Sequence, residues 1–334
     1  MKHKKLLCIL LLVTLAMSSL FALVACDNKN GKPEKITFVL DWTPNTNHTG
    51  LYVAKHLGYY ADEGLEVSFI QPGMDGCSVD VSTGVGQFGI DFQEQMIFNE
   101  QSSINVTAVA AVVQRNTSGI LVKGGIGIET LADITGHSYA TWGMPGEQAI
   151  VKYFAELCGG SVNDSDMVPN TVANIIAEFQ NPQGVDSVWS YEAWDVIRLE
   201  LAGIDHKFFK MSDIEVLDYY TPVIIANNDY LKKYPEYARK FVKATAAGYK
   251  YAIEHPAEAA EILMKENPEL REDEALILAS MNFLKSEYQA DAPKWGYIDQ
   301  TRWDNFFALM SSLVDEITTP ISKGYGFTNE FLPA

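Results

Sequence analysis

Ile36-Thr37-Phe38-Val39-Leu40-Asp41-Trp42 is the stretch that decides the fold. Its first five residues have the β-branched and large apolar character of a buried strand, and Asp41-Trp42 marks the end of that strand. A turn cluster at 43–47 separates it from apolar residues with helical spacing, which stop at Gly58. Residues 65–70 predict a second strand. A strand, a helix and a strand in this order predict an α/β fold with a mainly parallel sheet.

The same alternation continues along the chain and divides it into two lobes. Further strands are predicted at 88–90, 105–113, 119–122, 138–142, 185–189, 208–211 and 223–226. The glycine-rich turn at 124–127 is a candidate crossing between lobes, which places the first lobe at 35–124 and 223–334 and the second at 125–222. Two α/β lobes with two crossings predict a hinge and an inter-lobe cleft, the usual place for a small-molecule site.

The beginning of the chain differs in character from the rest. Three lysines among the first five residues precede an almost wholly apolar run at 6–25, which is the pattern of a secretory signal. Leu23-Val24-Ala25-Cys26 resembles the bacterial lipobox, so we expect a lipoprotein signal peptide at 1–25, lipidation of Cys26 and a polar tether at 26–34. An uncleaved membrane anchor and an ordinary signal peptide are the alternatives. The lipidated chain would lie at the cell membrane, on its extracytoplasmic face.

The charge balance is strongly acidic. The formal net charge is −18, and removal of residues 1–25, which carry three lysines and no acid, leaves 22 basic against 43 acidic side chains, a net charge of −21. Such a surface repels nucleic acid, so no nucleic-acid partner is expected. Beyond Cys26 the chain has only Cys77 and Cys158, for which either one disulfide or two free thiols remains open.

The sequence lacks the usual motifs of catalytic and metal sites. Gly84-Val85-Gly86-Gln87-Phe88-Gly89 matches GxGxxG, but it precedes a predicted strand, whereas a dinucleotide site needs these glycines between a strand and a helix. No GxSxG elbow, Walker loop or HExxH motif occurs. The six histidines never pair at ligand spacing. We therefore expect no enzyme, no cofactor and no metal.

Aromatic residues at predicted strand ends and turns are the candidates for ligand contact. Their flat rings suit stacking against a small heteroaromatic ligand, with core packing as the alternative for each. The aromatic candidates are Trp42, Trp142, Tyr191 and Tyr220. Polar contacts are expected from Asp41, Asn45, His48, Glu192 and the backbone N–H of Gly143. A structural role for His48, a salt bridge for Glu192 and a tight turn at Gly143 are the alternatives.

A longer pattern carries a resemblance to a known family. It comprises the stretches 36–42, 51–54 and 58–65 with His48 between them, and it continues through 119–122, 131–136, 226–230 and 328–332. The pattern resembles the thiamine-pyrimidine family, which includes bacterial binding proteins for thiamine pyrimidine precursors and the fungal enzyme that makes hydroxymethylpyrimidine phosphate. The resemblance implies a two-lobed type II periplasmic-binding-protein fold. It also implies that Trp42 helps form a pyrimidine site, that Glu192 holds the aminopyrimidine edge and that Tyr191 stacks on the ring.

Departures from the family pattern separate binding from catalysis. The fungal enzyme has a lysine that takes up pyridoxal phosphate and a histidine where this chain has Asp91 and Gln95, and its cysteine-rich run corresponds to 218–222, which has no thiol. The resemblance therefore implies a monomeric binding protein for a precursor such as formylaminopyrimidine, which delivers it to an ABC permease with its ATPase. Riboflavin, a sulfonate or another small organic ligand is the alternative, and an enzyme of pyrimidine synthesis is a remote one.

Overall fold

The computed structural model describes residues 32–334. The predicted signal peptide, Cys26 and most of the predicted tether lie outside the described residues and stay predictions. Residues Glu34–Ala334 form one compact unit. Among residues 32–334, no helix is both long and apolar enough to cross a membrane.

The first sheet contains β1 (Glu34–Val39), β2 (Leu65–Ile70), β3 (Phe88–Asp91), β4 (Val106–Ala111) and β10 (Val223–Asn227). Their order is β2-β1-β3-β10-β4. β1 pairs in parallel with β2 and β3, whereas β10 lies antiparallel between β3 and β4. The chain therefore returns from the second lobe into the middle of the first sheet, at the place where the sequence predicts a returning strand.

The second sheet contains β5 (Ser118–Lys123), β6 (Tyr139–Thr141), β7 (Met167–Pro169), β8 (Ser187–Tyr191) and β9 (His206–Lys210), in the order β7-β6-β8-β5-β9. β6 is parallel to β7 and β8, whereas β5 is antiparallel to β8 and β9. The expected two-lobed α/β architecture is confirmed, but both sheets are mixed rather than mainly parallel. β5 and β10 are the first strands after the two crossings. Each runs antiparallel to both of its neighbours in its sheet.

The first crossing lies earlier in the chain than the sequence predicts. β5 pairs with β8 and β9 and is buried along its whole length, so it is a central strand of the second sheet. The chain therefore crosses at 112–117, and the glycine-rich turn at 124–127 follows the crossing rather than making it. Strand propensity identifies β5 correctly but does not show which sheet supplies its partners. The second crossing occupies 211–222, between β9 and β10.

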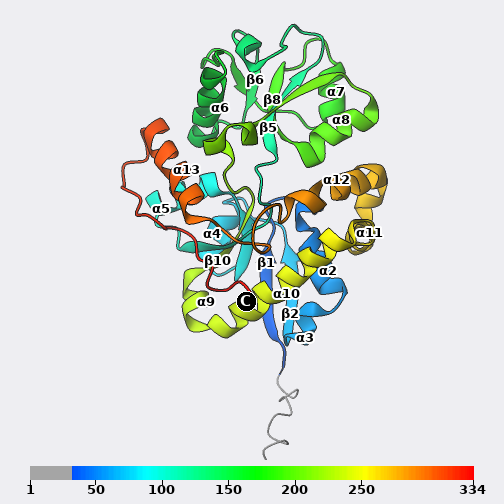
Figure 1. Cartoon of the computed structure of the whole chain (residues 1–334), viewed down its shortest axis with the longest axis vertical. Coiled ribbons are helices and arrows are strands. Elements are labelled where there is room, and N and C mark those ends of the chain that lie inside the picture. The colour runs from blue at the N-terminus through cyan, green and yellow to red at the C-terminus, as the bar shows by residue number, and fades with distance from the viewer. Residues whose placement is uncertain (1–31) are drawn as a thin grey trace, which may run out of the picture. The chain divides into compact units, whose positions relative to one another are not determined.

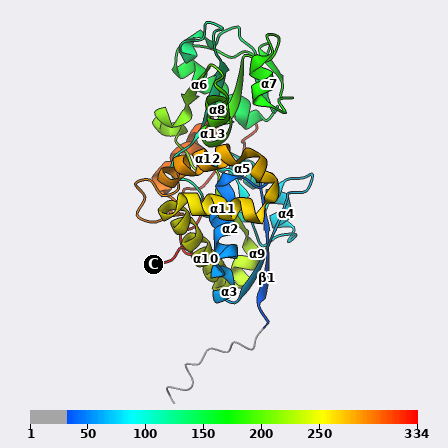
Figure 2. The same ribbon diagram turned by 90° about the vertical axis from the view of Figure 1, so that its right-hand side faces the viewer.

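Helices cover both faces of each sheet (Figures 1 and 2). One apolar cluster packs α2, α3 and α9–α12 against one face of the first sheet. A second cluster packs α4, α5 and α13 against the other face and continues into α6 and the second sheet. A third cluster packs α7 and α8 on the second sheet. These helices are α2 (Thr49–His56), α3 (Tyr59–Asp62), α4 (Cys77–Ser82), α5 (Gln93–Gln101), α6 (Pro145–Leu157), α7 (Ile175–Gln180), α8 (Ile197–Ala202), α9 (Asn228–Lys233), α10 (Pro235–Glu254), α11 (Pro256–Glu266), α12 (Glu274–Glu287) and α13 (Gln300–Leu313).

The two cysteines of the described residues are free thiols, which settles the alternative left open by the sequence. Cys77 is buried at the start of α4 and Cys158 is exposed at the end of α6, in the other lobe. Burial raises the pKa of the Cys77 thiol far above its usual value. Cys77 therefore stays in the unreactive thiol form at neutral pH.

Helices α2 and α10 of the first lobe approach each other closely at two glycines. A Cβ added at Gly248 of α10 would overlap the carbonyl oxygen of Gly50 in α2, and one added at Gly50 would overlap the ring of Tyr249. The ring of Tyr249 in turn stacks on Trp295 at 4.3 Å between centroids and donates a hydrogen bond from its hydroxyl to the Asn47 carbonyl, at 2.6 Å. Glycine at these two positions therefore permits the packing that holds the turn 43–47 in place.

Replacing Gly248 by alanine should destabilise the fold. The gain in helix propensity is outweighed by the overlap with α2, and overpacking of this kind typically costs about 1–3 kcal/mol. Urea unfolding of wild type and Gly248→Ala measures the difference. The matched control is Ala247→Ser, at the exposed neighbouring position of α10, where a change below about 0.5 kcal/mol is expected. Equal stability of Gly248→Ala and wild type would contradict the close helix packing.

Candidate functional site

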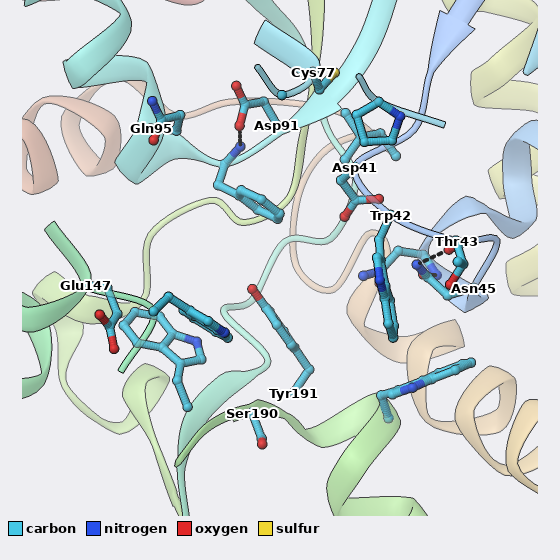
Figure 3. A pocket seen from close by; sticks show the side chains of 18 of the residues that line it. Asp41, Trp42, Thr43, Asn45, Cys77, Asp91, Gln95, Glu147, Ser190 and Tyr191 are labelled. Carbon is cyan, nitrogen blue, oxygen red and sulfur yellow. Dashed lines mark hydrogen bonds between the residues drawn. The ribbon is translucent and has the colours of Figure 1, made fainter. Parts of the chain in front are cut away.

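One large cavity, of about 1450 Å³, is lined by residues from both lobes (Figure 3). Asp41 and Trp42 follow the carboxyl end of β1, and Phe92 and Glu94 follow the carboxyl end of the parallel strand β3. From the second lobe, Tyr191, the last residue of β8, also lines the cavity. The carboxyl ends of parallel strands are where open α/β sheets bind ligands, because the loops that follow them gather at one edge.

Aromatic rings form much of the cavity wall. Trp42 and Trp142 are 58% and 50% exposed, unusual values for tryptophan, and Trp142 lies 6.2 Å from Trp189 with a tilt of 45° between the rings. Figure 3 shows Trp42 and Tyr191 directed into the pocket from different sides. Exposed rings that face one cavity from two lobes can stack on a flat ligand when the lobes close.

Asp41, Asn45 and His48 form one hydrogen-bonded unit after β1. Nδ1 of His48 accepts the backbone N–H of Asn45 at 3.2 Å, so its proton lies on Nε2, which donates to Oδ1 of Asp41 at 2.7 Å. His48 is completely buried and does not line the cavity, whereas Asp41 and Asn45 do. His48 is therefore placed outside the cavity lining, where it orients the Asp41 carboxylate at the cavity wall.

Glu192 lies outside the cavity, contrary to the role that the family resemblance implies. Its carboxylate pairs with Lys210 of β9 at 2.7 Å and lines a separate small cavity. Glu192 is the first residue of the short helical turn Glu192–Val196 that follows β8, and from there its side chain reaches Lys210.

Gly143 and Tyr220 are also absent from the cavity lining. The backbone N–H of Gly143 donates to Oγ1 of Thr141 at 2.9 Å, so it is not free to bind a ligand oxygen. Tyr220 is buried in the second crossing, where its hydroxyl accepts the backbone N–H of Asp299 at 2.9 Å. Of the sequence-predicted residues, the structure brings together Asp41, Trp42, Asn45, Trp142 and Tyr191.

The cavity is lined by acids that the sequence analysis did not single out. The lining contains Asp41, Asp75, Asp91, Glu94, Glu147, Asp195, Glu269 and Asp273. Within residues 32–334, the one cationic side chain of the lining is Arg198, and it makes two hydrogen bonds of 2.9 Å to Asp273. These acids form no group that could hold a metal ion in the described part of the chain. The cavity therefore favours a ligand that donates hydrogen bonds or carries positive charge.

Burial changes the protonation of several of these acids. It raises the pKa of Asp91 to about 6, although hydrogen bonds from Ser78 and the backbone N–H of Phe92 oppose the shift. It raises the pKa of Glu94 to about 8. The pKa values of Glu147 and Asp195 are also raised by burial. With these pKa values, Glu94 is mostly neutral at pH 7, whereas Asp91 is mostly ionised.

Glu94 is the functional candidate that the sequence analysis missed. It is the second residue of α5, immediately after β3, and its Oε2 is buried with no hydrogen-bond partner within residues 32–334. The signal that identifies it is positional. β1 and β3 are parallel, so a polar residue just after β3 reaches the same sheet edge as Asp41 after β1.

The chain has the two-lobed type II periplasmic-binding-protein fold. This fold class is defined by the strand order of the first sheet, the two crossings and a ligand-sized cavity between the lobes. Solved structures agree. The alkanesulfonate-binding protein SsuA from Xanthomonas axonopodis pv. citri, bound to MOPS, matches with a TM-score of 0.65 over 89% of this chain and 99% of that chain, at 14% identity. The chain belongs to the NMT1/THI5-like family, whose model matches residues 45–259.

Some curated proteins that are similar in sequence to this chain are named as binding proteins, and others are named as enzymes. A formylaminopyrimidine-binding protein of Halalkalibacterium halodurans is 28% identical over 77% of this chain and 79% of its own length. The riboflavin-binding protein RibY of Chloroflexus aurantiacus is 22% identical over 91% and 88%. The 4-amino-5-hydroxymethyl-2-methylpyrimidine phosphate synthase THI11 of Saccharomyces cerevisiae is 24% identical over 72% and 73%.

The raised pKa of Glu94 predicts pH-dependent stability of the ligand-free protein. An acid whose pKa is higher in the folded than in the unfolded state contributes stability below the unfolded value, near 4.5, and loses it as pH rises to about 8. The Tm should therefore fall across this interval, and Glu94→Gln should flatten the fall above pH 6, where Asp91 no longer contributes. Thermal unfolding at stepped pH measures both profiles. Parallel profiles of the two proteins would contradict the shift.

Proposed function

We propose that this protein is the extracytoplasmic substrate-binding component of an ABC importer and that it binds a thiamine-precursor pyrimidine such as formylaminopyrimidine. The observation that carries the proposal is the inter-lobe cavity, in which exposed tryptophan rings face acidic hydrogen-bond acceptors. An amino-substituted aromatic ring offers the complementary flat face and N–H donors. A relative with this family fold is named for binding formylaminopyrimidine, which supports the choice of ligand.

The charge of the cavity argues against an anionic ligand. Sulfonate binding needs a cationic or N–H-rich anchor. The lining offers Arg198 alone among cationic side chains of residues 32–334, and Asp273 already occupies both arms of its guanidinium. The same electrostatics disfavour a phosphorylated pyrimidine. The proposed ligand is therefore an unphosphorylated, amino-bearing ring.

Riboflavin is the second candidate, and the size of the cavity favours it. A volume of about 1450 Å³ exceeds the roughly 300–1,000 Å³ of typical small-molecule pockets. A relative covering 91% of this chain is named for riboflavin binding. Hinge closure would reduce the volume, however, so the open cavity also accommodates a single pyrimidine that is enclosed after the lobes move.

We propose binding rather than catalysis for this chain. Synthases occur among its relatives. In this chain, Asp91 stands where the fungal enzyme is expected to carry its pyridoxal-binding lysine. The Asp91 side chain accepts hydrogen bonds from Ser78 and from the backbone N–H of Phe92. A carboxyl group cannot form an imine, and Gln95 offers no imidazole.

The remaining parts of the proposal concern location and partners. Lipidation of Cys26 would hold the protein at the outer face of the cell membrane. The closed, liganded lobes would then dock as a monomer on a permease with its ATPase. These statements rest on the lipobox-like sequence and on the named roles of relatives.

A panel of ligands tests the proposed function. Ligand that binds only the folded state raises the Tm. We expect an increase with formylaminopyrimidine and with 4-amino-5-hydroxymethyl-2-methylpyrimidine, and none with the phosphorylated pyrimidine or an alkanesulfonate. Thermal-shift titration of the purified full-length chain provides the measurement. An increase with riboflavin alone would replace the pyrimidine by the second candidate, and an increase with the sulfonate would contradict the electrostatic argument.

Trp42→Ala should weaken pyrimidine binding without unfolding the protein. The ring is mostly exposed, so its loss removes a stacking surface rather than core packing. Loss of stacking together with part of the buried contact area predicts about tenfold weaker binding, measured by calorimetric titration. Leu157→Ala, at an exposed position of α6 outside the cavity lining, is the control and should bind as wild type does. Undiminished affinity of Trp42→Ala would remove Trp42 from the site.

A further inference from the structure

Glu94 and its neighbours form an unusual group of polar atoms at the cavity wall. Oε2 of Glu94, the hydroxyl of Tyr219 and Oγ1 of Thr221 are all buried and lack a hydrogen bond of normal geometry within the described chain. Both hydroxyl groups lie close enough to Glu94 for hydrogen bonding to lower its pKa, but not in a geometry that pairs the buried atoms. Folded proteins seldom leave buried polar atoms unpaired, because each has lost its hydrogen bonds to water. Three such atoms together, one of them on a residue that lines the cavity, indicate a place that a ligand completes.

Among residues 32–334, no cationic group is one of those that influence the carboxyl group of Glu94. The titratable groups that influence it are Asp91 at the end of β3, Tyr219 in the second crossing and Tyr191 at the end of β8, and none of these is cationic. Arg198, the one cation that the described residues contribute to the lining, is hydrogen-bonded to Asp273. Burial without a cation explains why the pKa of Glu94 rises to about 8. At neutral pH the group is therefore mostly a carboxylic acid, which has one O–H donor and one C=O acceptor.

A 4-aminopyrimidine presents the complementary pair of groups on one edge. Its exocyclic amino group is a donor, and the adjacent ring nitrogen is an acceptor. A neutral carboxyl group can meet this edge with two parallel hydrogen bonds, because its own donor and acceptor are adjacent in the same way. An ionised carboxylate lacks the donor and would leave the ring nitrogen unpaired, unless the ring carried the proton.

We propose that Glu94 is the specificity-determining residue of the cavity and that its protonated carboxyl group holds the aminopyrimidine edge by two parallel hydrogen bonds. This inference rests on the proposed function and deepens it. The carboxyl O–H donates to the ring nitrogen and the C=O accepts from the amino group. Trp42 and Tyr191 supply the stacking surfaces, and Glu192, which the family resemblance favours for this role, stays in its ion pair with Lys210.

Because the carboxyl proton of Glu94 takes part in binding, the affinity for the pyrimidine should depend on pH. Calorimetric titration of the purified full-length chain with 4-amino-5-hydroxymethyl-2-methylpyrimidine should show a constant Kd from about pH 7 to about 8. Above that, Kd should rise about tenfold per pH unit, because binding must then take up a proton. Asp91 is already ionised in this range, and burial keeps Tyr191 and Tyr219 protonated by raising their pKa values well above the usual one.

Two substitutions separate recognition from a structural role. Glu94→Gln keeps a donor and an acceptor that do not titrate, so it should bind within about tenfold of wild type at pH 7 and lose the rise in Kd above pH 8. Glu94→Ala should weaken binding about tenfold to a hundredfold. Glu100→Gln, on the same helix but outside the cavity lining, is the matched control and should keep the wild-type profile. If Glu94→Ala fails to fold, the pH profile of Glu94→Gln decides.

The outcomes distinguish this inference from the proposed function. Pyrimidine binding that is independent of pH up to about 10, and unchanged in Glu94→Gln, would overturn the role of Glu94 and leave the proposed function standing. Weaker binding in Glu192→Gln with wild-type behaviour of Glu94→Gln would also overturn it and restore the family-implied residue. Absence of binding to every pyrimidine tested would remove the function and this inference together.

Discussion

A single buried carboxylate, Asp218, holds together the two crossings from which both lobes extend. Its Oδ2 pairs with Arg115 at 2.8 Å and its Oδ1 accepts the backbone N–H of Asn116 at 2.8 Å, both in the first crossing. Arg302 of α13 pairs with the same carboxylate at 2.9 Å and donates to the carbonyl of Gln114 at 2.6 Å. Removing one partner from such a buried network leaves an uncompensated charge, which is strongly unfavourable. The network therefore fixes where β5 and β10 begin, and hence where the edges of the two sheets face the cavity.

The recognition group and the hinge share the same region of the molecule. Thr117 of the first crossing lines the cavity, and Tyr219 and Thr221 of the second crossing flank Glu94. A ligand held at Glu94 thus contacts the surroundings of the segments whose backbone must turn when the lobes close. Differential contact of this kind is what allows a ligand to favour the closed state over the open one. On this proposal the acid at this position also has a physical reason, because a bound ligand would pair the buried oxygen of Glu94 that lacks a well-formed hydrogen bond.

The scaffold by itself does not determine what a member of this family does. Relatives of this chain are named for binding a pyrimidine, for binding riboflavin and for synthesising a pyrimidine phosphate. The difference must lie in the side chains that face the cavity, because the backbone arrangement is shared. In the described part of this chain those side chains include aromatic rings and eight acids, with Arg198 as the one cation, already paired with Asp273. That composition suits an amino-bearing ring and offers no amine for covalent chemistry at Asp91.

Local patterns in the sequence determined most strands and helices and the first-lobe end of the site. Asp41 and Trp42 could be placed because a strand followed by a turn puts its last residues at the ligand-binding edge of a parallel pair. Only the tertiary structure decided that β5 joins the second sheet, that Glu192 turns away to pair with Lys210, and that Glu94 is the unpaired acid of the cavity. The physical reason is the same in all three cases. Each depends on which distant segments become neighbours, and local propensity and alternation carry no information about that choice.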